Sequence, residues 1–309
     1  MALRDYLRGE VVEDYADGFL TRREALRRLG ILGLGLTSAT ALIAACGGDD
    51  DDDDAAASDP TTTAASTAPT TNEVVSTTTT ASASPTAETI TFAGPRGELQ
   101  AAYAAPADPK GAVLVVHENR GLTPHFYDVA GRLAAEGYAA LSVDLLSEEG
   151  GTASLADPAA APGALADASD ERLLDDLTAG IDELERRVPG APIGVVGFCF
   201  GGGMTWNLIE AGDPRIAAAV PFYGPGPAEA DFSDSNAAVL GIYAGLDDGV
   251  NASRDAMEAA LTSAGLTHEI RTFEGVDHAF FNDTGPRYNE AAATEAYAAL
   301  LAWFDEHLQ

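Results

Sequence analysis

The sequence predicts an α/β fold in which a mostly parallel sheet is covered by helices on both faces. Short apolar runs such as Ala112–Val116 recur along the chain, as expected for strands buried on both sides. Segments with helical periodicity lie between these runs, so strands and helices alternate. At residues 193–211 an apolar strand, a Gly-x-Cys-x-Gly turn and a helix follow one another directly.

Ordered structure is expected to begin near Glu88. Residues 89–92 and 98–105 flank a Pro/Gly turn and predict a β-hairpin. Ser169 is a plausible N-cap for a long helix, and the preceding segment, rich in Gly, Ala and Pro, predicts a loop. The remaining expected strands are 112–116, 139–143, 216–222, 239–243 and 268–273, together with a short strand that begins at 193 and leads into the Gly-x-Cys-x-Gly turn at 197–201. The expected helices are 124–136, 170–187, 201–211, 252–264 and 289–307. Together they predict one domain over residues 86–309.

Composition excludes several classes of function. The 309 residues include 49 acidic and 17 basic ones, giving a formal net charge of −32. No basic stripe is available for phosphates, so a nucleic-acid partner is excluded, and the acidity is best explained by solubility. The two cysteines, Cys46 and Cys199, allow neither a disulfide scaffold nor a multi-cysteine zinc site. No His/Asp/Glu cluster has metal-ligand spacing, so we expect no metal and no cofactor.

Residues 1–45 have the pattern of an export signal. Arg22 and Arg23, followed by Arg27 and Arg28, precede an apolar run over Leu29–Ala45. The paired arginines resemble a twin-arginine signal, and residues 43–46 resemble a bacterial lipobox in which Cys46 would be lipidated. The alternative is an uncleaved single-span anchor, for which the run is short. Both interpretations place the rest of the chain outside the cytoplasmic membrane, attached only through its N-terminus.

Residues 46–85 predict a flexible tether. Six aspartates, Asp49–Asp54, follow Gly47-Gly48, and a tract rich in Thr, Ala, Ser and Pro continues to about Pro85. Such a segment has almost no large apolar residues with which to offset the entropy of ordering. Contiguous aspartates without a glycine-spaced loop indicate solvated charge rather than a calcium site.

The turn at Cys199 predicts a nucleophile. A strand that reverses sharply into a helix needs glycine on both sides, because side chains there would clash with neighbouring backbone. The amide of Phe200 would lie at a helix N-terminus, which favours negative charge and a lowered thiol pKa. A lone cysteine near a core strand is more often a small buried hydrophobe, so the nucleophile hypothesis requires an acid and a histidine further along the chain.

Both partners follow in the required order. Strand 239–243 leads into Asp247 and Asp248, and strand 268–273 leads into Asp277 and His278. Functional groups of such sheets collect at the carboxyl ends of the strands. We therefore predict that His278 is the general base and that Asp247, the first acid after its strand, orients the imidazole.

Three other candidates are less favoured. Asp248 is the alternative acid. His117 and His125 are expected to be structural rather than catalytic.

Four stretches together resemble the dienelactone hydrolase family, a branch of the α/β-hydrolase fold, over residues 86–309. They are 117–121 (HENRG), 197–202 (GFCFGG), 245–250 (GLDDGV) and 278–281 (HAFF). The resemblance implies a Cys199–His278–Asp247 triad, with Glu118 lying against the nucleophile and helping to form the thiolate when substrate binds. It further implies an oxyanion hole made by the amides of Phe200 and Asn119.

The sequence departs from the family at the arginines that bind a substrate carboxylate. Residues 145–149 (LLSEE) and Asn282 occupy the corresponding places, and neither supplies a cation. Arg120 is the nearest candidate cation, and Tyr223 and Phe280 are further candidates for substrate contact. An anionic pocket mouth would repel an anionic lactone, so this pattern favours an uncharged substrate.

The predicted function is hydrolysis of small esters or lactones through a thioester acyl-enzyme, by an exported monomer. A membrane-tethered binding protein that kept the fold without turnover is the main alternative. A redox-active thiol protein is a further one, although no second cysteine lies near Cys199 in the sequence to resolve a disulfide.

Overall fold

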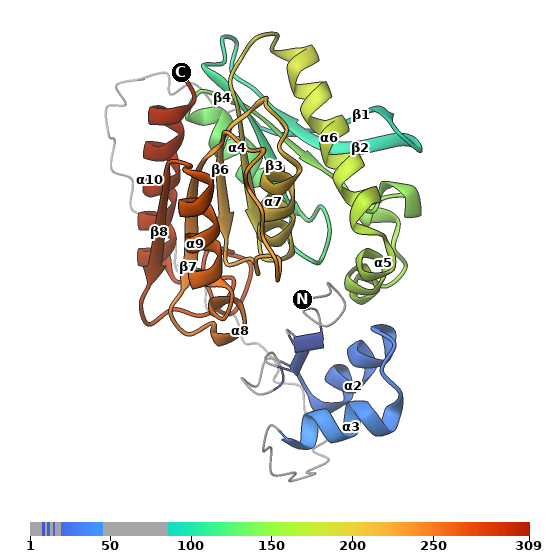
Figure 1. Ribbon diagram of the computed structural model, residues 1–309. Coiled ribbons are helices and arrows are strands. Elements are labelled where there is room, and N and C mark those ends of the chain that lie inside the picture. Colours follow the sequence, from blue (N-terminus) through green and yellow to red (C-terminus); the bar gives the residue numbers. More distant parts are fainter. Residues whose placement is uncertain (1–7, 10, 13–14, 16–19, 46–85) are drawn as a thin grey trace, which may run out of the picture.

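A computed structural model describes residues 8–9, 11–12, 15, 20–45 and 86–309 (Figure 1). Its core is an eight-stranded sheet with the order β1-β2-β4-β3-β5-β6-β7-β8. The predicted hairpin is formed by β1 (Glu88–Gly94) and β2 (Gly97–Ala104), and β2 is also antiparallel to β4. All other neighbouring strands are parallel, which confirms the predicted mostly parallel sheet.

Five of the six later strands coincide with the predicted ones to within one residue at each end, and β5 begins at the predicted Ile193 but extends into the predicted turn as far as Phe198. The six are β3 (Gly111–Val116), β4 (Tyr138–Val143), β5 (Ile193–Phe198), β6 (Ile216–Phe222), β7 (Ala238–Ala244) and β8 (His268–Phe273). Every residue of β3, β4, β5 and β7 is buried. Burial on both faces explains why these strands are continuous apolar runs rather than alternating ones. The edge strand β8 is largely half-exposed and has a more polar sequence.

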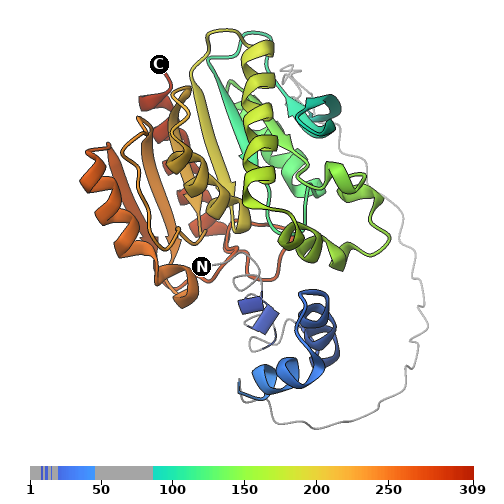
Figure 2. The ribbon, with the colours of Figure 1, turned by 45° about the vertical axis from the view of Figure 1, so that its right-hand side comes forward.

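Helices cover both faces of the sheet (Figure 2). The long helices are α4 (Pro124–Ala135), α6 (Asp170–Arg187), α7 (Phe200–Ala211), α9 (Arg254–Ala264) and α10 (Glu290–His307). Helices α6 and α7 lie together on one face, and α4 and α10 lie on the other. The predicted cap is present, since the Ser169 hydroxyl accepts a hydrogen bond from the Arg172 amide at 3.2 Å.

Two predictions at the level of elements need correction. The segment before α6, predicted as loop, contains α5 (Ala161–Asp167) and three short 3-10 turns. Its composition hid the helix, although Pro162 in the first turn is a recognised helix-start signal. The predicted helix 252–264 is preceded by a separate short helix, α8 (Asp248–Asn251), which Asp247 caps.

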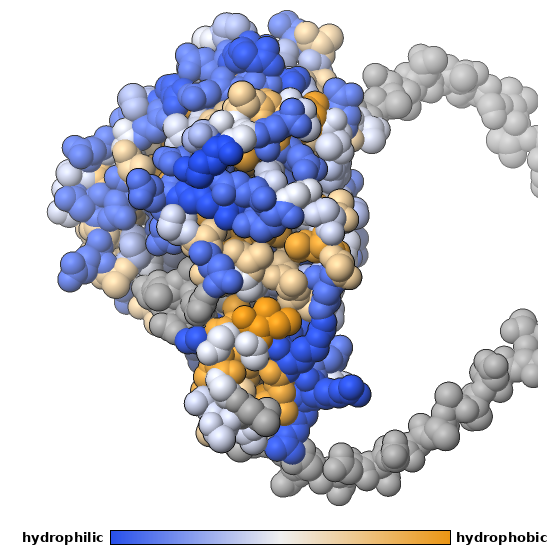
Figure 3. Space-filling model, turned by 90° about the vertical axis from the view of Figure 1, so that its right-hand side faces the viewer, coloured by the Kyte–Doolittle hydropathy of each residue, from blue (hydrophilic) through white to orange (hydrophobic). Residues whose placement is uncertain are grey.

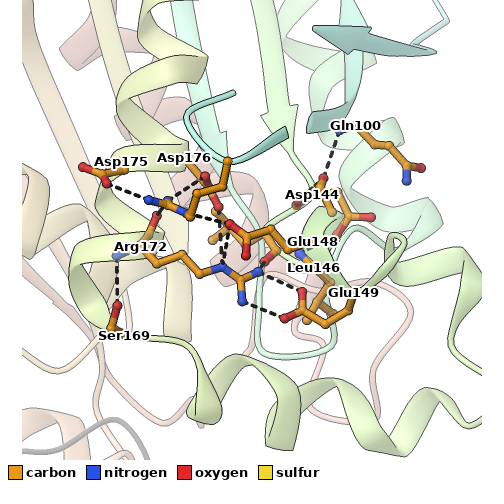
Figure 4. Close-up of polar contacts among 12 residues, drawn as sticks. Gln100, Asp144, Leu146, Glu148, Glu149, Ser169, Arg172, Asp175 and Asp176 are labelled. Carbon is orange, nitrogen blue, oxygen red and sulfur yellow. Dashed lines mark hydrogen bonds and ion pairs between the residues drawn. The ribbon is translucent and has the colours of Figure 1, made fainter. Parts of the chain in front are cut away.

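An ionic cluster fixes the loop that leaves β4 (Figure 4). Arg96, in the β1–β2 turn, contacts Glu148 at 2.6 Å and Asp176 of α6 at 3.0 Å. Arg172 of α6 makes a bidentate contact with Glu149 at 2.6 and 2.8 Å. The loop after β4 is thereby attached both to the hairpin and to α6.

The N-terminal segment forms two helices, α2 (Arg22–Ile31) and α3 (Leu36–Ala45). The chain turns between them, where Gly33 has a φ of 79°. They lie beyond one end of the sheet strands (Figures 1 and 2). Among the residues that the structure describes, no helix combines the length and apolar character needed to cross a membrane. Cys46 and the predicted tether at 46–85 lie outside the described residues.

Candidate active site

Cys199 lies at the turn between β5 and α7, with φ 58° and ψ −121°. Its side chain is buried, and its amide donates to the Phe222 carbonyl at 3.1 Å. A Cβ atom on Gly197 would overlap the carbonyl of Gly201, and one on Gly201 would overlap the carbonyl of Val116. Both flanking residues must therefore be glycine if the turn is to form, as the sequence motif predicts.

His278 and Asp247 form a buried pair. Nδ1 of His278 donates to Asp247 Oδ2 at 2.7 Å, because an ionised carboxylate can only accept. The other carboxylate oxygen of Asp247 accepts from the Val250 amide at 3.0 Å, which fixes the carboxylate plane. Asp248 is exposed, and Asp277 instead contacts Arg287 at 3.4 Å. The imidazole of His278 thus pairs with Asp247, whereas Asp277 accepts from the backbone amide of His278 at 2.6 Å.

Glu118 lies between two donors from distant parts of the chain. It follows β3, the strand directly beside β5, and it is only 8% exposed. The Asn282 amide donates to Oε2 at 2.7 Å, and the Tyr223 hydroxyl approaches Oε1 at 3.5 Å. Burial and the nearby Glu118 and Cys199 raise the pKa of Tyr223 well above its usual value, so the phenol stays protonated and can only donate to the carboxylate.

A cavity of about 400 Å³ brings these groups together at the carboxyl ends of the strands. Its wall includes Cys199, His278, Glu118 and Asn119, so the predicted nucleophile and base face the same space. Phe200 is the first residue of α7, and its amide therefore has no acceptor within the helix. An oxyanion formed on substrate bound to Cys199 would find this amide at a helix N-terminus.

The three candidates for substrate contact differ in position. Arg120 is exposed and lines the cavity. Tyr223 is buried beneath the site, with its ring 5.0 Å from that of His278. Phe280 is fully buried, 5.5 Å from the Tyr223 ring and 5.4 Å from that of Phe273. Phe280 therefore packs behind the site, and of the three candidates only Arg120 lines the cavity, so its contact with substrate stays a prediction.

The charge of the cavity differs from the sequence-based expectation. Arg287, which that reasoning missed, lines the same cavity as Arg120, and its side chain is only 8% exposed. Glu148 and Glu149 are held by Arg96 and Arg172 in the cluster of Figure 4. Arg287 is itself paired with Asp277 at 3.4 Å, so among the described residues the cavity wall is not predominantly acidic, while the preference for an uncharged substrate stays a prediction. Arg287 lies nine residues after His278 and belongs to no motif that would have identified it from the sequence.

His117 is structural. It is completely buried, its Nδ1 bonds to the Glu118 carbonyl at 2.7 Å, and its Nε2 accepts from the Leu145 amide at 3.1 Å. These contacts fix a neutral ring with the proton on Nδ1, and burial lowers its pKa. His117 thereby joins the loops after β3 and β4. His125 contacts Asp283 at 3.0 Å and likewise stands outside the cavity wall.

The strand order, the strained turn and the buried His–Asp pair define an α/β-hydrolase. Solved structures agree. A dienelactone hydrolase homologue from Klebsiella pneumoniae is 30% identical with a TM-score of 0.64, and the match covers 72% of this chain and 98% of that one. A thermostable carboxyl esterase from Bacillus coagulans, 10% identical with a TM-score of 0.58 over 72% and 99% of the two chains, shares the fold alone.

The family follows from sequence. The model of the dienelactone hydrolase family matches residues 99–308. A carboxymethylenebutenolidase homologue from Salmonella typhi is 34% identical over 226 residues, covering 68% of this chain and 83% of the relative. One from Methylorubrum extorquens is 31% identical, covering 68% and 78%. The chain belongs to the dienelactone hydrolase family, and it is a carboxylic ester or lactone hydrolase.

Proposed function

We propose that the protein hydrolyses small esters or lactones through a Cys199–His278–Asp247 triad and a thioester intermediate. One observation carries the proposal. Cys199 is held on a strained turn, in the cavity that His278 also lines, while His278 is bonded to buried Asp247 at 2.7 Å. Nucleophile, base and orienting acid are the three parts that acyl transfer requires.

In the acylation step the Cys199 thiolate attacks the carbonyl carbon of the substrate. The thiol proton passes to His278, and Asp247 stabilises the imidazolium that forms. The amides of Phe200 and Asn119 would hold the negative carbonyl oxygen. The carbon–oxygen bond to the leaving group then breaks, and the leaving oxygen takes the proton from His278. In a lactone this oxygen remains attached to the acyl group.

Deacylation reverses these roles. His278 takes a proton from water, and the hydroxide attacks the thioester carbon. The carbon–sulfur bond breaks, the acid product leaves, and Cys199 is regenerated as the thiol. Glu118 would assist the acylation step when substrate binds, because a carboxylate in the same cavity, held by Asn282, can take up the thiol proton and pass it on to His278.

Substitution of the nucleophile tests the mechanism. Cys199→Ala should abolish turnover of p-nitrophenyl acetate and of a small lactone, and mass spectrometry of quenched wild-type enzyme should detect an acyl adduct on Cys199. Asp247→Asn should lower kcat by about 10⁴-fold because the wrong imidazole tautomer is held. The exposed neighbour Asp248→Asn is the matched control and should retain activity. Full turnover by the Cys199→Ala enzyme would identify another nucleophile.

We further propose that the protein is exported and attached to the membrane through Cys46. The support is the order of Arg22-Arg23, the apolar run and the lipobox-like residues 43–46 in the sequence. Cys46→Ala should then move the protein from the membrane fraction to the soluble fraction of cells that make it. Retention of this variant in the membrane would instead favour an uncleaved anchor.

A further inference from the structure

Part of the N-terminal segment lies against the cavity that contains Cys199. Leu20 and Arg28 form one side of its wall, and Cys199, His278 and Glu118 form the other. Leu20 is 7% exposed, although it lies outside the catalytic domain in the sequence. We call residues 20–32 the cover segment. Substrate that approaches Cys199 from this side would meet the cover segment first.

A second cavity, of about 630 Å³, continues from the first under the cover segment. The two cavities share Arg28, Asn119, Arg120 and Thr123 in their walls. On the cover side the second cavity is lined by Ile31 and Leu32. On the domain side it is lined mainly by small and apolar residues, among them Leu122, Leu155, Ala159, Pro162 and Gly163. The cover segment therefore spans an apolar groove next to the proposed catalytic groups.

Specific contacts hold the cover segment on this groove. The Ile31 side chain lies so close to Gly163 that a Cβ atom there would overlap it. Arg27 forms an ion pair with Asp157. Leu32 is 2% exposed, and apolar side chains gather on the N-terminal helices and continue onto the adjoining domain surface (Figure 3). Apolar burial of this kind is the main favourable contribution to association.

The cover segment is itself well formed. The Thr21 hydroxyl accepts from the Glu24 amide at 3.3 Å, and the Glu24 carboxylate accepts from the Thr21 amide at 3.1 Å, which completes a capping box. At the other end, Arg8 donates to the Leu32 carbonyl at 2.8 Å. A helix fixed at both ends loses less entropy when it docks than an unstructured peptide would.

We propose that the cover segment is an intramolecular inhibitor that closes the active site of the full-length chain. This inference rests on the proposed function only in taking the cavity around Cys199 as the active site. If residues 1–45 are removed at Cys46, the same cleavage uncovers the apolar groove and opens access to Cys199. The enzyme would then become fully active only after processing.

Releasing the cover in the full-length chain tests this proposal. Ile31→Glu places a charge against the groove, and Leu42→Glu is the matched control, because both side chains are 39% exposed and Leu42 lies on α3 away from both cavities. Two rates are measured in a Cys46→Ser background: alkylation of Cys199 by iodoacetamide and hydrolysis of p-nitrophenyl acetate. If about 90% of molecules are closed, Ile31→Glu should raise both about tenfold, and Leu42→Glu should raise neither.

A charge swap supplies a second, independent measurement. Arg27→Glu and Asp157→Arg should each raise the alkylation rate, and the double variant should restore it toward the wild-type value. Equal alkylation rates for Ile31→Glu and Leu42→Glu would overturn the proposal, and so would slower hydrolysis after release, since the segment would then complete the site. If the released variants are alkylated faster, but neither they nor the parent chain hydrolyse p-nitrophenyl acetate, the inhibitory role of the cover segment is supported and the proposed function is contradicted.

Discussion

Three residues other than glycine have positive φ within the described chain, and all three belong to the site. They are Cys199 at 58°, Tyr223 at 33° and Ala279 at 59°. Each such backbone conformation costs on the order of 1–3 kcal/mol and persists only where the surrounding structure fixes it. Here Cys199 and Tyr223 are fixed by amide hydrogen bonds to the Phe222 and Ile242 carbonyls, at 3.1 and 2.7 Å. Among the described non-glycine residues, this backbone conformation therefore occurs only at Cys199, at Tyr223, whose hydroxyl approaches Glu118, and at Ala279, which follows His278.

The hydrogen bond from Asn282 to Glu118 should matter for catalysis. Among the described contacts, Asn282 is the only donor within 3 Å of the Glu118 carboxylate, and Asn282→Leu removes it. We expect kcat/KM to fall about tenfold, which corresponds to a rise of ~1.4 kcal/mol in the activation free energy. Tyr223→Phe should have a smaller effect, because its contact at 3.5 Å is at the weak limit.

The pH profile of kcat/KM separates this positioning role from a general loss of structure. Asn282→Asp adds a like charge beside Glu118, so it should lower activity more than Asn282→Leu and shift the acid limb of the profile upward. Identical profiles for wild type and both variants, with unchanged thermal stability, would mean that Glu118 does not depend on Asn282.

The buried neutral His117 should make stability depend on pH. Because burial lowers its folded pKa, the unfolded chain binds a proton below pH ~6.5 that the folded chain does not. The His117 contribution is therefore complete above pH ~6.5 and decreases as pH falls toward the folded pKa, by up to ~1.4 kcal/mol per pH unit. Urea unfolding between pH 7.5 and pH 5.5, at about the same ionic strength throughout, measures the slope. His117→Asn should unfold more easily but with a shallower slope, and an equal slope would contradict this account.

At the scale of elements, the sequence predicted strands better than loops. Strands such as β3 and β5 are buried on both faces, so their apolar runs are an unambiguous local signal. Helix α5 gives no such signal, because Ala161–Asp167 is composed mainly of Ala, Pro and Gly and is held by contacts with its surroundings. The two-helix form of residues 22–45 was not predicted either, since the apolar run conceals the break at Gly33.

The loop after β4 should depend more on Asp144 than on the surface ion pairs. Asp144 is 3% exposed and accepts from the Thr152 amide at 2.6 Å, the Thr152 hydroxyl at 2.7 Å and the Leu146 amide at 3.0 Å. Asp144→Ala should lower the free energy of unfolding by about 3 kcal/mol, because buried donors lose a charged acceptor. Asp175→Ala, whose carboxylate is 49% exposed and pairs with Arg96 (Figure 4), should cost less than ~1 kcal/mol. Similar losses in urea titrations would contradict the argument.

At the scale of the whole molecule, the chain order of Cys199, Asp247 and His278 was sufficient to predict the three groups that the fold brings together. The carboxyl ends of parallel strands meet at one edge, so local motifs specify a common site. The contacts around Glu118 were not predictable, because Asn282 lies 164 residues away in the sequence and its approach depends on how the final loop packs. The same holds for Arg287 and for the cover segment, whose positions follow from tertiary packing rather than from a motif.

The net charge of −32 should make the molecule more stable at higher salt. Many of the arginines are already paired with carboxylates, as in the cluster of Figure 4, so the unbalanced charge is repulsive. Raising NaCl from about 0.05 to 1 M shortens the screening length from more than ~10 Å to ~3 Å, which weakens this repulsion. Exposed ion pairs weaken too, but each contributes only ~0–1 kcal/mol. The melting temperature should therefore rise by several degrees, about 2–4 °C for each kcal/mol gained.

Calorimetry at neutral pH measures this rise, with sucrose of equal osmolarity to separate charge screening from solvent exclusion. The same salt step near the isoelectric point of about 4.1 should produce little change, because protonation of the carboxylates has removed the repulsion. A fall in melting temperature at neutral pH would mean that attractive pairs, rather than the excess of acidic groups, dominate the electrostatics of the folded chain.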